Sequence, residues 1–170
     1  MSQDMCVPCD DGYVNIRVGA IIMKDGRFLM VGNDHVDYYY SVGGRIQFGE
    51  NAEQAVIREV QEETGVRMEI DHLGFVTENY FIADTQPRYG RVYYEISFFF
   101  YMKTPEDFEP VCSSFTEDES SEYLAWVSPD EPRVIFPEFF RSELDIDDKS
   151  LRYIYIDDRN EPLRKKNFRS

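Results

Sequence analysis

Apolar side chains along this chain fall into short runs that are typical of β-strands. The runs are rich in Val, Ile, Tyr and Phe, and clusters of Gly, Pro and Asp separate them. We predict strands over residues 14–23, 27–31, 38–42, 67–82, 91–103, 123–127 and 152–156, the last as an edge strand. Gly74 interrupts the fourth run, and the FFF run at 98–100 indicates a strand buried on both faces.

A helical pattern appears over about residues 52–64. Asn51 is a good N-cap, and Gln54 three residues later completes a capping-box pattern. Glu53 in the first turn suits the positive end of the helix dipole, and Gly65 supplies the left-handed residue that ends a helix. Apolar positions with helical spacing form the stripe that should face the core, namely Ala52, Val56 and Val60.

Strands grouped around a central helix, with a second short helix predicted over 137–144, indicate an α/β fold. We expect a mixed β-sheet sandwiched by helices, an α-β-α sandwich. The chain has 170 residues, a length that suits one domain. We assign the domain to residues 13–158, with an N-terminal tail over 1–12 and a basic C-terminal tail over 159–170.

Composition narrows the range of functions. Apolar residues make up 42% of the chain and aromatic residues 15%, so the chain folds rather than staying disordered. The formal net charge of −15 argues against nucleic-acid binding, because phosphate backbones require a positive surface. The N-terminus has no signal-like apolar run, and the stretch 93–102 is too short to cross a bilayer, so we expect a cytoplasmic protein without membrane contact.

Cys6 and Cys9 form a C-x-x-C pair, and a third cysteine stands alone at position 112. An odd number of cysteines does not suggest a disulfide framework. We expect reduced thiols on the N-terminal tail. Half of a zinc site is the alternative, although the sequence shows no further ligands at a suitable spacing.

Three glutamates on the predicted helix are the main candidates for chemistry. Glu59, Glu62 and Glu63 stand at i, i+3 and i+4 and therefore share one helix face. Carboxylates are hard oxygen ligands suited to Mg²⁺ or Mn²⁺, and a cation would offset their mutual repulsion. The alternative is a solvated face on which Arg58 pairs with Glu62.

These glutamates belong to a longer pattern. Residues 44–66 read GRIQFGENAEQAVIREVQEETGV, with fixed points at Gly44, Glu50, Arg58, Glu59, Val60, Glu62, Glu63, Gly65 and Val66. The segment resembles the Nudix box, G-x5-E-x7-R-E-U-x-E-E-x-G-U with U a bulky apolar residue, at every fixed position. The resemblance implies a fold in which helices flank a mixed sheet, and an enzyme that cleaves diphosphate linkages.

The resemblance also implies roles for individual residues. Glu59, Glu62 and Glu63 align with the carboxylates that hold divalent cations in the family, Mg²⁺ or Mn²⁺. Gly43 aligns with a position whose carbonyl often joins the metal shell. Glu50 and Arg58 align with positions that brace the loop and orient the glutamates.

The reaction implied is attack of water on one phosphorus of a nucleoside diphosphate linked to another group. In the family the proton goes to a box glutamate or to an acidic residue from a loop late in the domain. Candidates in this sequence precede the 123–127 strand, namely Glu117, Asp118, Glu119 and Glu122. We favour Glu119 and Glu122.

Substrate contacts are less constrained. Arg45, Arg88 and Arg91 are candidates for binding phosphates, and Tyr40, which leads into the glycine loop, is a candidate for the pocket wall. The substrate is expected to be a nucleoside triphosphate, a nucleotide sugar, ADP-ribose or a dinucleotide. The resemblance also implies a possible homodimer, because family members often dimerise.

Two other functions stay open at this point. One is a catalytically silent module that keeps the fold in order to sense or bind a nucleotide, which the complete set of box glutamates disfavours. The other is cleavage of an RNA 5′ end, which the acidic composition disfavours.

Overall fold

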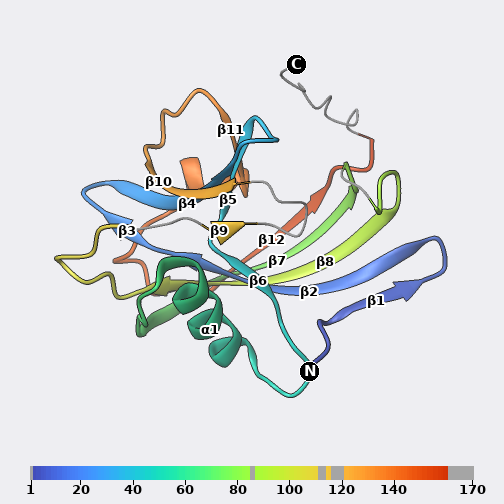
Figure 1. The fold of residues 1–170 in the computed structure, drawn as a ribbon, viewed down its shortest axis with the longest axis horizontal. Helices are drawn as coiled ribbons and strands as arrows, with labels where there is room; N and C mark the ends of the chain where they lie inside the picture. The colour runs from blue at the N-terminus through green and yellow to red at the C-terminus, as the bar shows by residue number, and fades with distance from the viewer. Residues whose placement is uncertain (1, 85–86, 111–113, 116–120, 161–170) are drawn as a thin grey trace.

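The computed structural model describes residues 2–84, 87–110, 114–115 and 121–160, and within these ranges two mixed sheets and one α-helix form the fold. Figure 1 shows the first sheet across the middle of the molecule, with the second sheet on one side and α1 (Ala52–Thr64) on the other. The α/β sandwich class that we predicted is confirmed, although sheets contribute more of the described fold than helices.

The first sheet has the strand order β1-β2-β8-β7-β12, with β6 paired to β2 off this path. Its strands are β1 (Cys6–Cys9), β2 (Gly12–Ile21), β6 (Gly43–Arg45), β7 (Ile70–Ile82), β8 (Val92–Met102) and β12 (Arg152–Asp157). The β2–β8 and β7–β12 pairs are parallel, whereas the other pairs are antiparallel.

The second sheet has the order β11-β5-β4-β10-β9, with β3 paired to β4. Its strands are β3 (Met23–Lys24), β4 (Arg27–Asn33), β5 (Tyr38–Ser41), β9 (Ser114–Phe115), β10 (Ser121–Val127) and β11 (Val134–Phe136). A short 3-10 helix, η1 (Glu138–Arg141), replaces the longer helix predicted over 137–144.

Two apolar clusters hold these layers together. In the first, Val56 and Val60 of α1 pack with residues of the first sheet such as Ala20 and Phe100. The second cluster joins the two sheets, and Phe75 and Phe99 of the first sheet belong to it with these residues of the second sheet and η1: Phe28, Met30, Val127, Ile135 and Phe140. Because apolar layers cover both of its faces, β2 is continuously buried over residues 18–21.

The predicted limits of α1 are confirmed. The side chain of Asn51 accepts a hydrogen bond from the Gln54 N–H at 2.8 Å, and the Gln54 side chain accepts one from the Asn51 N–H at 2.9 Å. Gly65 ends the helix with φ of 75°. Among the described residues, no helix has the length and apolar character that crossing a membrane requires.

The N-terminal segment differs from the prediction. Residues 6–9, which we expected in a tail, form β1 and pair with β2. Cys6 and Cys9 stand three apart on this strand, so their side chains point to opposite faces and do not form half of a zinc site in this conformation. Both are free thiols. The basic residues beyond position 160 lie outside the described ranges.

Candidate active site

Glu63 lies in the last turns of α1 and its carboxylate reaches β6. The backbone N–H of Gly43 donates a hydrogen bond to Oε1 of Glu63 at 3.1 Å. Oε2 is buried and has no hydrogen-bond partner among the described residues. Burial raises the pKa of Glu63 to about 8; the hydrogen bond from Gly43 opposes this shift, and the neighbouring charges of Glu59 and Glu122 add to it.

Two glycines of β6 allow the glutamates to approach this strand. A Cβ atom at Gly44 would lie 2.5 Å from the carboxylate carbon of Glu59, so a larger residue would displace that side chain. Gly43 has φ of 140°, in the region that favours glycine. Burial raises the pKa of Glu59, whereas its hydrogen bond from Arg58 lowers it. Glu59 and Glu63 are therefore gathered against one short strand.

Arg58 connects the helix to the loop that precedes it. Its Nη2 donates to Glu50 Oε1 at 2.6 Å, and its Nη1 donates to Glu59 Oε1 at 2.7 Å and to Glu62 Oε2 at 3.2 Å. Nη2 also donates to the carbonyl of Arg45 at 3.1 Å. These bonds raise the pKa of Arg58 and lower that of Glu50. This geometry suits the bracing role that the family resemblance implied for Arg58 and Glu50.

The N-terminal segment supports the same loop. The Met5 N–H donates to the carbonyl of Ile46 at 2.8 Å, and the Phe48 N–H donates to the carbonyl of Gln3 at 2.7 Å. Gln47 within this loop donates its backbone N–H to Glu50 at 2.8 Å. Figure 1 shows the N-terminus beside the loop that enters α1. The segment before β1 therefore fixes the loop that positions Arg58 and the glutamates.

Tyr40 and Glu122 reach the same region from the second sheet. The Tyr40 hydroxyl donates to Glu122 Oε1 at 2.5 Å. Burial and then this hydrogen bond raise the pKa of Tyr40 above its ordinary range, and the charge of Glu63 contributes to the increase. Tyr40 thus holds Glu122 near Glu63, and its contact with substrate stays a prediction. Glu119, our other candidate base, lies outside the described residues.

The three candidate arginines lie in different places. Arg45 follows Gly43 and Gly44 on β6, and its Nε donates to Asn15 Oδ1 at 3.1 Å. Arg88 stacks over the Tyr13 ring at 4.5 Å and donates to Tyr93 and Cys6. Arg91 is exposed in the turn before β8. Of these three arginines, only Arg45 belongs to β6, the strand that Glu59 and Glu63 contact.

Sequence reasoning missed the pairing of Asn15 on β2 with Glu95 on β8, beside Arg17, which projects from the first predicted strand. Asn15 donates from Nδ2 to Glu95 Oε2 at 2.7 Å, and Arg17 Nη1 lies 4.0 Å from the same oxygen. Arg17 also lowers the pKa of Glu59 and Glu63. The available signal was the presence of Asn15 and Glu95 within otherwise apolar strand runs.

A divalent cation suits the carboxylates on this face of α1, of which those of Glu59 and Glu63 lie against β6. Glu59, Glu62 and Glu63 offer hard carboxylate oxygens. The buried Oε2 of Glu63 has no hydrogen-bond donor among the described residues, and a cation would take the place of such a donor. Across the described ranges, no three Asp, Glu, His or Cys side chains already converge as a ligand set, because Arg58 draws Glu59 and Glu62 toward itself. Binding a cation would therefore require these side chains to turn away from Arg58.

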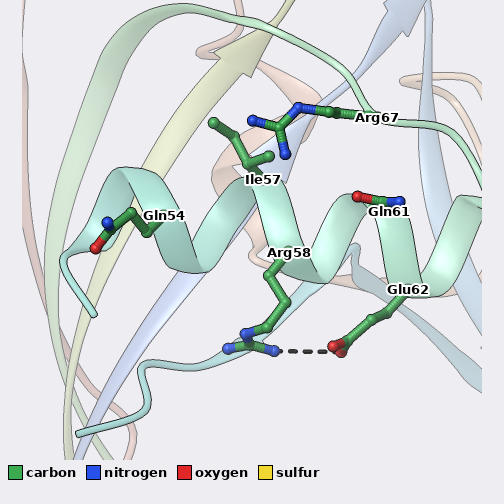
Figure 2. A pocket seen from close by; sticks show the side chains of 6 residues that line it. All are labelled: Gln54, Ile57, Arg58, Gln61, Glu62 and Arg67. Carbon is green, nitrogen blue, oxygen red and sulfur yellow. Dashed lines mark hydrogen bonds and ion pairs between the residues drawn. The ribbon is translucent and has the colours of Figure 1, made fainter. Parts of the chain in front are cut away.

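A depression of about 510 Å³ on the outer side of α1 is a separate feature. Figure 2 shows its lining residues, including Arg58 and Glu62 joined by an ion pair. Glu59 and Glu63 do not line it, so this depression is not the place where the buried carboxylates would act.

Comparisons with known proteins agree with this geometry. The family model described as NUDIX domain matches residues 14–153. A MutT-like protein of Streptomyces ambofaciens is 38% identical over 61 residues, which span 36% of this chain and 40% of that protein.

Solved structures share the fold. The MutT protein of Bacillus halodurans has a TM-score of 0.59 at 17% identity, covering 84% of this chain and 89% of that one. A NUDIX hydrolase of Nitrosomonas europaea has a TM-score of 0.53 at 18% identity, covering 92% and 95%.

Fold and site together define a mixed α/β sandwich with a glutamate-bearing helix packed against a glycine strand. With the family match over most of its length, this chain belongs to the Nudix family. Members of this family generally use divalent metal ions.

Proposed function

We propose that the protein hydrolyses a diphosphate linkage in a nucleoside diphosphate joined to another moiety, with Mg²⁺ or Mn²⁺ as cofactor. The substrate class comprises nucleoside triphosphates, nucleotide sugars, ADP-ribose and dinucleotides. The observation that carries the proposal is the buried Glu63 carboxylate, which accepts from Gly43 through one oxygen and has no partner for the other among the described residues. A carboxylate kept in this state costs stability and is therefore retained for a ligand.

The residues at and near β6 have different proposed roles. The cation would be held by the carboxylates of Glu59, Glu62 and Glu63 and by the Gly43 carbonyl. It would neutralise the charge that develops on the phosphate oxygens. Arg58 keeps two of these carboxylates and Glu50 in register along the helix and loop. Arg45, on the same strand as Gly43, would bind a phosphate.

Glu122 is our candidate to accept the proton of the attacking water. Tyr40 fixes the Glu122 carboxylate through a 2.5 Å hydrogen bond. The charge of Glu122 raises the pKa of Glu63, so Glu122 borders the proposed metal ligands. Glu119 stays an alternative for this role. Glu122→Gln and Glu119→Gln distinguish the two candidates. Replacing the true base should remove the dependence of turnover on an ionised carboxylate, whereas replacing the other residue should leave that dependence in place.

The test is product release from a nucleotide panel with Mg²⁺ or Mn²⁺, comparing the wild type with Glu63→Gln. We expect metal-dependent cleavage of one substrate class and its loss in the variant. Glu53→Gln, an exposed glutamate in the first turn of α1, is the matched control and should keep activity. Nucleotide binding without any turnover in the wild type would contradict the proposal and indicate a sensing module.

A further inference from the structure

One face of the first sheet carries its side chains in transverse rows that the strand register defines. Asn15 of β2, Glu95 of β8 and Asn79 of β7 form one row, because Asn15 pairs with Glu95 and Glu95 pairs with Asn79. The next row contains Arg17, Ser97 and Thr77. Facing pairs in a sheet point to the same side, so these six polar residues form one surface, which we call the polar belt.

The polar belt is unusual for central strands. Asn15 is 2% exposed, and Ser97 and Thr77 are each 4% exposed. The row beyond it contains Phe99 and Phe75, which belong to the core between the sheets. Burying polar groups is costly unless each is hydrogen-bonded, and β-branched apolar residues would pack better here. Polar side chains at these buried positions therefore point to a role beyond packing.

Hydrogen bonds within the belt hold Glu95 in a fixed orientation. Asn15 Nδ2 donates to Oε2 at 2.7 Å, and Ser97 Oγ donates to Oε1 at 3.3 Å. Arg17 is only loosely paired with it, at 4.0 Å, and 15% of the Glu95 side chain is exposed. Beside it, Oδ1 of Asn79 is buried and accepts no hydrogen bond from the described residues. The belt thus places a partly exposed carboxylate beside a buried amide oxygen that has no donor among the described residues, and both groups can accept hydrogen bonds.

A row of aromatic rings borders the belt on its other side. Tyr13, Tyr93 and Phe81 stack with ring centroids 5.3 Å and 5.2 Å apart, and the Arg88 guanidinium covers Tyr13. Flat apolar rings beside a few fixed polar groups are typical of sites that bind a planar ligand.

The belt is connected to the glutamate site through β6. Gly43 and Arg45 stand two residues apart on that strand and pair with Gly19 and Arg17 of β2. Arg45 donates to Asn15, the residue that orients Glu95. Two residues of a strand span about 7 Å, so a nucleotide whose phosphates lie at Gly43 can place its base over the belt.

We propose that Glu95 and Asn79 bind the base of the nucleotide substrate and select guanine, whose Watson–Crick edge presents two adjacent N–H donors to these acceptors. Adenine presents a single amino group beside a ring acceptor on that edge, so it satisfies the pair poorly. The inference rests on the proposed hydrolase function, and it identifies the substrate class within it.

The experiment compares GTP with ATP as substrates, and GDP with ADP as ligands by calorimetry, for the wild type and Glu95→Gln. We expect a kcat/KM preference for GTP of about 10-fold or more, since one two-point base contact discriminates at that level. Glu95→Gln should reduce the preference to about 3-fold or less and should weaken GDP binding with little change for ADP.

Glu78→Gln is the matched control. Glu78 belongs to β7 beside Asn79 but faces the opposite side of the sheet, where Tyr94 and Tyr153 donate to it. This variant should keep the wild-type preference, and thermal unfolding of both variants should show that each is folded. Asn79→Leu keeps the approximate volume of the side chain, removes the acceptor and should weaken selection of guanine in the same direction.

The outcomes separate this inference from the proposed function. Turnover of GTP and ATP at equal rates, unaffected by Glu95→Gln, would overturn base selection and leave the hydrolase intact. Selective GDP binding without any turnover would support base recognition and contradict hydrolysis. A Glu95→Gln effect on the preference among nucleotide sugars that share one base would mean that the belt binds sugar hydroxyls, and it would overturn the assignment to guanine.

Discussion

The two oxygens of the Glu63 carboxylate are in different environments, because Gly43 donates its backbone N–H to one of them at 3.1 Å and the other is buried without a donor among the described residues. The backbone contact fixes the direction of the side chain. The second oxygen is left available to a ligand at a place where water does not reach it.

Glu63→Gln should separate activity from stability. The variant keeps the shape of the side chain but removes the charge, so metal-dependent turnover should fall by about 100-fold or more. Without metal and above pH 8, the free energy of unfolding should rise by about 1–2 kcal/mol, because no buried carboxylate has to ionise. Kinetic assays measure the change in turnover, and chemical denaturation measures the change in the free energy of unfolding. A variant that loses stability under these conditions would show that Glu63 mainly supports the fold.

Metal affinity should depend on pH through Glu63. Burial raises its pKa from an ordinary value of 4.5 to about 8, so the native state holds this proton between those values. The stability that this proton contributes is complete below pH 4.5 and is lost as pH rises through 8. A cation must displace the proton, so Mg²⁺ affinity should rise up to about 10-fold per pH unit between pH 6 and 8. Calorimetric titration of the wild-type protein with Mg²⁺, without nucleotide, measures this dependence. A Mg²⁺ affinity that does not change with pH would contradict the prediction.

Gly44→Ala should impair activity while the protein stays folded. The new Cβ would lie 2.5 Å from the Glu59 carboxylate and push it from its position beside Arg58. We expect turnover to fall by about 10-fold or more. If the effect passes through Glu59, the alanine should add little in a Glu59→Gln background, which a double-mutant cycle measures. Fully additive losses would argue for a separate effect on the backbone.

Tyr40→Phe should change catalysis through Glu122. Loss of the hydroxyl removes the 2.5 Å hydrogen bond and frees the carboxylate to rotate. We expect kcat to fall by about 3- to 10-fold with KM nearly unchanged, together with a shift in the pH profile of kcat. Tyr155→Phe, on the exposed side of β12, is a control that should alter neither. A change confined to KM would instead support the substrate-binding role predicted for Tyr40.

Local signals in the sequence predicted the elements that depend on local chemistry. Asn51, Gln54 and Gly65 defined the ends of α1 because capping depends on neighbouring residues. Gly74 marked the irregularity in β7, where the register with β8 shifts between Leu73 and Phe75. The spacing of the glutamates likewise placed them on one helix face before any tertiary contact was known.

Features that depend on distant segments were not predictable in this way. β1 is a strand because β2 offers it an edge, and the sequence CVPC contains no strand signal strong enough to reveal that. The partnership of Asn15 with Glu95 requires the parallel β2–β8 register, which joins residues 80 positions apart. The arginines showed the same limit, since only the sheet topology distinguishes Arg45 beside the glutamates from Arg88 at the far end of the sheet.

The parallel pairing of β2 with β8 also sets the order in which a nascent chain can mature. The glutamate helix and β6 leave the ribosome before β8 has been synthesised. Until then β2 has no parallel partner, and its apolar side chains stay exposed. The first sheet is completed later still, when β12 arrives beside β7. We therefore expect slow folding governed by non-local contacts, with the first sheet incomplete until β12 has been synthesised.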